Sequence, residues 1–343
     1  MNLVITILIL GIIIFIHELG HFLSAKYFNM PVSEFAIGMG PKLFSHETLE
    51  TTYSIRAIPV GGFVNIEGME VGSEVEDGFN SKPPLARFIV LFAGVFMNFV
   101  LALVIIYGMV VSGGKVIQNE GAFVGNVMEQ SKAYNILQKG DEIVEINDRE
   151  IKKWDDILGV VRENIKKEGD SLNIEVMREG ERVALDIEPY FDDERGQPII
   201  GILPEYEVEK YGFVEGFKVT GTTFVEIFAQ TLGGLKMLIT GKVKADEVSG
   251  PVGMIKVVGQ ASKGGALLLV WLTAMLSVNI GIFNLLPFPA LDGGRIVFVI
   301  LELLGVNVNK KLEERLHMAG MIILIGLILL ITMNDVTNLF IRR

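Results

Sequence analysis

The stretch that decides the fold is LVITILILGIIIFIHELGHFL, residues Leu3 to Leu23, which is almost entirely apolar before a His-Glu-Leu-Gly-His run. It is long enough to cross a bilayer as one α-helix. Residues four apart lie on one helix face, so the imidazoles of His17 and His21 can reach a single metal ion while Glu18 lies beside it. Ionisable groups at membrane depth cost roughly 2.5 to 3.5 kcal/mol each, so three of them need a compensating partner. The run predicts a metal site inside the membrane; paired core or surface histidines are the alternative.

Composition indicates a membrane protein. Of the 343 residues 50% are hydrophobic, and the mean hydropathy is +0.46. Four stretches are long and apolar enough to span a bilayer: Leu3–Phe28, Leu85–Val111, Ala266–Leu286 and Met318–Phe340. The first has no basic leader and carries the histidine motif, so we expect it to be retained and not cleaved as a signal peptide. The net charge of −11 speaks against nucleic-acid binding, and the absence of cysteine leaves His, Asp and Glu as metal ligands.

Basic residues in the short loops predict the orientation. They cluster between the first two spans and before the fourth, at Lys26, Lys42, Arg56, Lys82, Arg87, Arg295, Lys310, Lys311 and Arg315. By the positive-inside rule both loops are cytoplasmic, and the segment from Ser112 to Lys263 faces outward. Within it, the stretch Thr220–Gly241 is apolar but carries charges, and we expect an amphipathic helix on the outer membrane surface. A further span there would put Asp292 and His21 on opposite sides.

The outward segment predicts a small α+β domain between Gly121 and Pro189. Short β-like runs alternate with one helical stretch and with turn residues, namely Phe123–Met128, Asp141–Ile146, Trp154–Lys166, Leu172–Met177 and Arg182–Ile187. The run Ala133–Ile151 resembles the bacterial form of the PDZ domain. That resemblance implies capture of an extended peptide or a chain end along a strand edge. A folded plug that binds nothing specific is the alternative.

A second constellation closes the third apolar run with NLLPFPALDGG, residues Asn284 to Gly294. Its prolines break the helix and are followed by an acid, so Asp292 is a candidate third metal ligand. A turn that caps the next helix is the alternative for Asp292. Asn284 is a candidate hydrogen-bond donor to a substrate carbonyl or oxyanion, with ordinary helix–helix bonding as its alternative. His46 and His317 are expected at solvated or interfacial positions.

These motifs, in this order, resemble the site-2 protease family of intramembrane zinc metalloproteases, specifically its bacterial RseP-like group with a single PDZ domain. The resemblance covers nearly the whole chain and also includes Gly94 with Asn98 and the run Ser249–Gly253. It implies one Zn²⁺ held by His17, His21 and Asp292, with Glu18 as general base. It also implies that a β-like loop at Tyr53–Ile66 pairs with substrate as an added strand, through Gly61, Gly62, Phe63 and Val64; a plain cytoplasmic hairpin is the alternative.

The expected fold is an α-helical polytopic membrane protein of about four transmembrane helices, with a membrane-associated β-hairpin loop and an inserted α+β PDZ-like domain. We expect residues 1–112 to form two spans with the loop, and residues 113–200 to form the PDZ-like domain. Residues 201–263 should form the amphipathic surface-helix region, and residues 264–343 two further spans with the Asp-Gly-Gly motif.

The expected function is regulated proteolysis in the bacterial cytoplasmic (inner) membrane, with the active site toward the cytoplasm and the PDZ-like domain outside. The resemblance implies single-span membrane proteins as substrates, either anti-sigma factors or remnant signal peptides. A catalytically inactive membrane adaptor that binds partners through the PDZ-like domain is the competing class. An ion transporter is disfavoured because no inverted repeat is visible.

Overall fold

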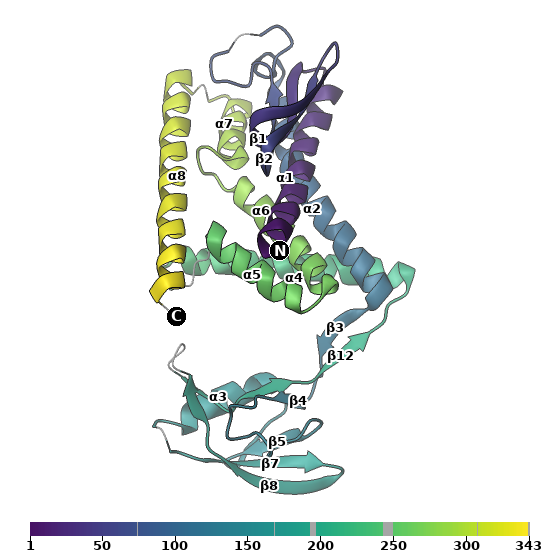
Figure 1. Cartoon of the computed structure of the whole chain (residues 1–343), viewed down its shortest axis with the longest axis vertical. Helices are drawn as coiled ribbons and strands as arrows, with labels where there is room; N and C mark the ends of the chain where they lie inside the picture. Colours follow the sequence, from purple (N-terminus) through teal and green to yellow (C-terminus); the bar gives the residue numbers. More distant parts are fainter. Residues whose placement is uncertain (74, 168, 193–196, 243–249, 307, 342–343) are drawn as a thin grey trace. The chain divides into compact units, whose positions relative to one another are not determined.

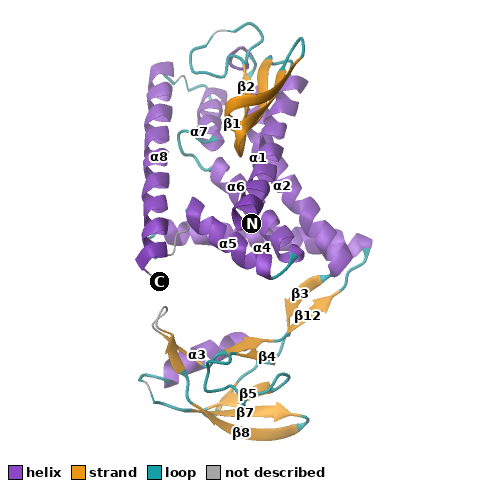
Figure 2. Ribbon diagram, in the orientation of Figure 1, coloured by secondary structure: helices purple, strands orange, loops and turns teal. Residues whose placement is uncertain are grey.

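The computed structural model describes residues 1–73, 75–167, 169–192, 197–242, 250–306 and 308–341. The chain divides into two compact units, one made of residues 1–109 and 213–343 and the other of residues 110–212. Figures 1 and 2 show the first unit as helices with one long hairpin, and the second as mostly β-structure.

Four helices of the first unit are long and apolar enough to cross a membrane: α1 (Asn2–Tyr27), α2 (Pro84–Gly113), α6 (Ala266–Leu285) and α8 (Lys310–Ile341, apolar over Lys310–Thr337). The four predicted spans are therefore confirmed. Their outward faces carry exposed large apolar side chains, such as Leu8 and Ile12 on α1 and Ile322 and Leu330 on α8. Such continuous apolar surface is what a lipid environment covers.

The buried face of α1 follows the helical period. Apart from the adjacent pair Gly20 and His21, its buried residues recur every three or four positions, at Thr6, Ile9, Ile13, His17, Gly20, His21 and Ala25. The two histidines therefore belong to the stripe that packs into the bundle. Gly20 is required there, because a Cβ at this position would lie 2.3 Å from the carbonyl oxygen of Ala93 on α2.

A long antiparallel hairpin follows α1, formed by β1 (Val32–Glu47) and β2 (Thr52–Ile66). Its register is irregular, with repeated shifts along the ladder. Gly38 in β1 has φ of +85°, and a Cβ there would lie 2.6 Å from the carbonyl oxygen of Ile58 in β2. Glycine is therefore needed where the strands bend together. The predicted β character of the loop is confirmed.

Two helices cross the end of the bundle opposite to the hairpin, as Figure 1 shows: α4 (Phe213–Ile239) and α5 (Pro251–Lys263). Among the described residues, helix α4 is not one of the membrane-spanning candidates. It starts at Phe213, before the predicted stretch. Of the predicted Ser249–Gly253 motif, Ser249 lies outside the described residues. Gly250 and Gly253 donate their backbone N–H groups to the Asp335 carboxylate of α8, at 3.1 and 2.7 Å.

The second unit is the expected α+β domain. Its four-stranded antiparallel sheet has the order β6-β5-β7-β8, made of Arg149–Glu150, Glu142–Ile146, Leu172–Arg178 and Glu181–Ile187. Helix α3 (Trp154–Asn164) contributes Ile157, Val160 and Val161 to the shared apolar core. The remaining strands form two-stranded pairs: β4 (Val124–Val127) with β11 (Ile202–Pro204), β3 (Lys115–Gln118) with β12 (Tyr206–Glu209), and β9 (Tyr190–Asp192) with β10 (Gln197–Ile199).

The compact unit is longer than the expected 113–200. It runs from Val110 to Gly212, because β11 and β12 return to pair with β4 and β3 near its start. Residues 201–212 therefore belong to this unit and not to the surface-helix region. Such strands of three or four residues carry too little periodicity to be recognised in sequence.

Candidate metal centre

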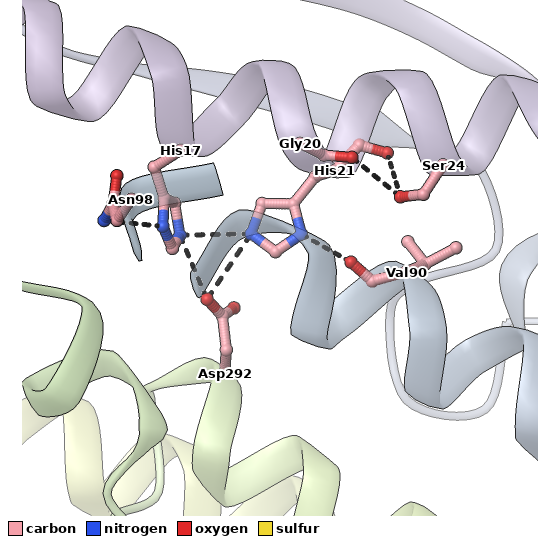
Figure 3. Close-up of polar contacts among 7 residues, drawn as sticks. All are labelled: His17, Gly20, His21, Ser24, Val90, Asn98 and Asp292. Carbon is pink, nitrogen blue, oxygen red and sulfur yellow. Dashed lines mark hydrogen bonds and ion pairs between the residues drawn. The ribbon is translucent and has the colours of Figure 1, made fainter. Parts of the chain in front are cut away.

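Helix α1 supplies two imidazoles that face each other. The Nε2 atoms of His17 and His21 lie 3.1 Å apart, and both side chains are buried. Their rings meet edge to face, with centroids 4.7 Å apart. Figure 3 shows both rings leaving the same face of the helix, as the four-residue spacing requires.

A carboxylate from far along the chain completes the group. Asp292 is the first residue of α7 (Asp292–Leu303), and its Oδ2 lies 3.0 Å from Nε2 of His17 and 3.4 Å from Nε2 of His21. The glycines after it let α7 start tightly against the preceding loop. A Cβ on Gly293 would lie 2.3 Å from the carbonyl oxygen of Leu285, and one on Gly294 would lie 2.4 Å from that of Phe288.

The other ring nitrogen of each histidine also has a polar partner. Nδ1 of His21 lies 2.8 Å from the carbonyl oxygen of Val90, which can only accept, so Nδ1 carries the proton and Nε2 keeps its lone pair. Nδ1 of His17 lies 3.3 Å from the side-chain amide of Asn98. The amide atom that faces Nδ1 is Nδ2, so as placed it donates to the ring; the amide would have to turn by 180° for its oxygen to accept from Nδ1 and give His17 the tautomer of His21.

The donor set fits a tetrahedral metal ion. The three ligand atoms are separated by 3.0, 3.1 and 3.4 Å. Donors at zinc bond lengths of about 2.0 to 2.1 Å in a tetrahedron lie about 3.3 to 3.4 Å from one another. In the described part of the chain, the group whose ligand atoms lie close enough together to hold a metal consists of His17, His21 and Asp292. Three protein ligands leave a fourth position for water or substrate.

Helix α2 leaves the space that the imidazoles occupy. A Cβ on Gly94 would lie 2.4 Å from Nε2 of His21 and 2.8 Å from Cε1 of His17. The glycine thus lets α2 approach the two rings directly. The groups packed against Gly94 are the two imidazoles of the candidate site.

The hairpin lies against the remaining member of the motif. The backbone of Val64 in β2 is within hydrogen-bonding reach of the Glu18 carboxylate. A Cβ on Gly62 would lie 3.8 Å from Cγ of Glu18. Gly61, Gly62, Phe63 and Val64 are all in β2, where the last three pair with Ile37, Ala36 and Phe35 of β1.

Asn284 lies half-buried in the last turn of α6. In the described part of the chain, the side-chain amide that contacts a histidine of the site belongs to Asn98 and not to Asn284. In the sequence, only the family resemblance pointed to Asn98, together with Gly94. The packing of α2 on α1 decides which histidine Asn98 contacts, and through which ring nitrogen. The Val90 carbonyl carries no signal in the sequence, because every residue has a backbone carbonyl.

A buried pair of histidines with an aspartate, beside a glutamate and among helices long enough to span a membrane, is the arrangement expected of a membrane metallopeptidase of the site-2 type. The model of peptidase family M50 matches residues 5–327, and the chain belongs to that family.

Relatives align over nearly their whole length. The chain is 48% identical to "Putative zinc metalloprotease FN1322" of Fusobacterium nucleatum over 99% of this chain and 100% of that protein. It is 32% identical to "Regulator of sigma-W protease RasP" of Bacillus subtilis over 97% of this chain and 98% of that protein. A solved PDZ domain of an SdrC-like protein from Listeria innocua is 30% identical, covering 25% of this chain and 96% of that domain, with a TM-score of 0.23.

Proposed function

We propose that this M50 peptidase is a zinc-dependent intramembrane protease that hydrolyses peptide bonds in or near the transmembrane segment of single-span membrane proteins. The observation that carries the proposal is the meeting of His17, His21 and Asp292, whose Oδ2 atom lies 3.0 and 3.4 Å from the Nε2 atoms of the two histidines. A zinc ion held there would polarise the scissile carbonyl and increase the acidity of a water molecule.

Glu18 is the general base in this proposal. Its carboxylate lies beside the proposed ligands and takes a proton from the attacking water, which it then delivers to the leaving amine. The neighbouring backbone of Val64 orients the carboxylate. The Val90 carbonyl at Nδ1 of His21 and the Asn98 amide at Nδ1 of His17 leave the Nε2 atoms of both rings on the side of Asp292.

The hairpin presents the substrate. A transmembrane helix hides its peptide bonds in internal hydrogen bonds, so it must be unwound before hydrolysis. In the described residues strand β2 pairs with β1 in a two-stranded sheet, and its segment Gly61–Val64 lies next to Glu18. An extended substrate segment added to this strand would run past the carboxylate. Asn284 then serves as a donor to the scissile carbonyl.

The membrane topology and substrate class follow from the same site. The histidines lie in the half of α1 nearer to the hairpin, whose flanking basic residues predict the cytoplasmic side of a bacterial inner membrane. The PDZ-like domain is then extracytoplasmic. The name of the Bacillus subtilis relative, a regulator of sigma-W, supports anti-sigma factors as one substrate class; remnant signal peptides are the other.

The decisive test compares purified wild type with Glu18→Gln in detergent, measuring zinc content and cleavage of a model single-span substrate. We expect one zinc per chain in both proteins and cleavage by wild type only. Glu47→Gln, which changes an exposed carboxylate on β1, is the matched control and should cleave normally. Absent zinc, or equal cleavage by both proteins, would favour the adaptor. Asp292→Ala should lower zinc content, and full occupancy in that variant would return Asp292 to a capping role.

The role of the PDZ-like domain can be tested by a deletion that the strand pairing suggests. Gln118 at the end of β3 and Tyr206 at the start of β12 are paired neighbours. Replacing residues 119–205 by Asn-Gly therefore closes these strands as a hairpin and leaves the first unit intact. Cleavage of a full-length, untrimmed substrate by this variant would indicate that the domain excludes substrates. Loss of all cleavage would indicate that it recruits them.

A further inference from the structure

Helix α8 holds the loop that carries Asp292. Between α6 and α7, Ala290 has φ of +85°, a conformation that residues with a Cβ rarely adopt. Its backbone N–H donates to Nδ1 of His317 on α8, at 3.2 Å. The neighbouring Pro287 and Pro289 have no N–H to offer. The unusual backbone at Ala290 is thus stabilised by a side chain from another helix.

A second contact from the same face of α8 supports this hold. Gly320 lies one turn after His317, and a Cβ there would lie 2.4 Å from the carbonyl oxygen of Pro289. The backbone of α8 therefore packs directly on the loop. The ring of Phe298 on α7 lies against the His317 imidazole, with centroids 5.4 Å apart, and limits its rotation.

The held residue is close to the proposed metal ligand. Ala290 lies two residues before Asp292, so a change in its backbone angles moves the start of α7. Metal–ligand distances tolerate deviations of only about 0.2 Å. A loop with two prolines and a left-handed alanine needs external support to place the carboxylate within that tolerance.

We infer that His317 is a positioning residue, which holds Asp292 in place for the metal through its hydrogen bond with the Ala290 backbone. This inference rests on the proposed metal site. The sequence suggested an interfacial place for His317, but the structure turns its ring toward the loop.

The unpaired nitrogen of His317 argues that the imidazole does more than pack. Because Nδ1 accepts a hydrogen bond, the proton of the neutral ring is on Nε2. Nε2 is buried, and no hydrogen-bond partner for it is present in the described part of the chain. A buried unpaired donor is costly, and a phenylalanine would fill the same space without that cost. The acceptor at Nδ1 is the feature that a phenylalanine could not supply.

The test uses the purified full-length protein in detergent with three substitutions on α8. His317→Phe keeps a ring and removes the acceptor, whereas His317→Asn keeps an acceptor oxygen at the position of Nδ1. Gly320→Ala pushes on the same loop by a different route. His46→Phe, at an exposed position on β1, is the control. Zinc affinity is measured by competition with a chromophoric chelator, and the ligand geometry by the visible absorption of the Co²⁺-loaded protein.

We expect His317→Phe and Gly320→Ala to weaken zinc binding by about 10- to 100-fold, the range found for residues that orient metal ligands. Their Co²⁺ spectra should also change. The zinc affinity of His317→Asn should stay within about threefold of wild type, which is a much smaller loss than the one expected for His317→Phe. The inference is overturned if both weakening variants bind zinc and Co²⁺ as wild type does, or if Asn is no better than Phe. A wild type that binds no zinc would instead refute the proposed function.

Discussion

Gly94→Ala tests the claim that α2 makes room for the metal ligands. The added Cβ would lie 2.4 Å from Nε2 of His21 and 2.8 Å from Cε1 of His17. Ordinary contacts between such atoms are about 3.5 Å, so the rings or the helix must move by roughly 1 Å at the first atom. That displacement is several times the deviation of about 0.2 Å that a zinc site tolerates.

The expected magnitude follows from the cost of overpacking. Inserting a methyl group into a packed site costs about 1 to 3 kcal/mol. If the metal-bound arrangement carries that cost, zinc binding weakens by about 5- to 150-fold, at tenfold per 1.4 kcal/mol. Helix propensity acts in the opposite direction on the fold, because alanine is more favourable than glycine by up to about 1 kcal/mol in a helix interior. We therefore expect lower zinc affinity with little loss of thermal stability.

The matched control is Gly108→Ala on the same helix. A Cβ at Gly108 would meet nothing within 4 Å, so this variant gains helix propensity without touching the site. Zinc affinity is measured in detergent by chelator competition, together with cleavage of a single-span substrate. Wild-type affinity and activity in Gly94→Ala would show that the rings move aside freely, which would refute the argument from the close approach of α2.

Three further predictions concern other contacts. Asn98→Leu removes the partner of Nδ1 of His17 and should weaken zinc binding by about tenfold or more. The affinity is measured by chelator competition, and an unchanged value would mean that the amide does not orient the ring. Asp141→Ala removes a buried carboxylate that binds the partly exposed guanidinium of Arg178, and should destabilise the PDZ-like domain by about 1 to 3 kcal/mol. Limited proteolysis that proceeds no faster than in wild type would contradict this. Asp335→Leu removes the acceptor of two backbone N–H groups at the start of α5. This change should lower the stability of the protein in detergent by about 1 to 3 kcal/mol. An unchanged melting temperature would show that α5 does not need this cap.

Much of the fold was predictable because its signals are local. Each membrane-spanning helix is a continuous apolar run, and its length is set by the bilayer. The main strands of the second unit alternate in polarity between turn residues, so they were found within one or two residues. Strands β11 and β12 were missed because each is only three or four residues long and exists through pairing with a distant segment.

The candidate site was predictable in part for the same reason. Helical spacing places His17 and His21 on one face whatever the rest of the chain does. For Asp292 the sequence offered a metal ligand or a helix cap, and the structure has it at the first position of α7 and also 3.0 Å from His17. Asn284, chosen by its chemistry, lies on α6 without the histidine contact that Asn98 makes.

The sequence by itself determined that this chain is a polytopic membrane protein with two histidines on one face of its first helix and an inserted α+β domain, because hydrophobic length, helical period and strand alternation are properties of neighbouring residues. Only the tertiary structure decided which carboxylate meets the histidines, that Val90 and Asn98 face their Nδ1 atoms, and that His317 supports the loop before Asp292. These contacts join helices distant in the chain, and their geometry depends on how closely glycines such as Gly94 let the helices approach.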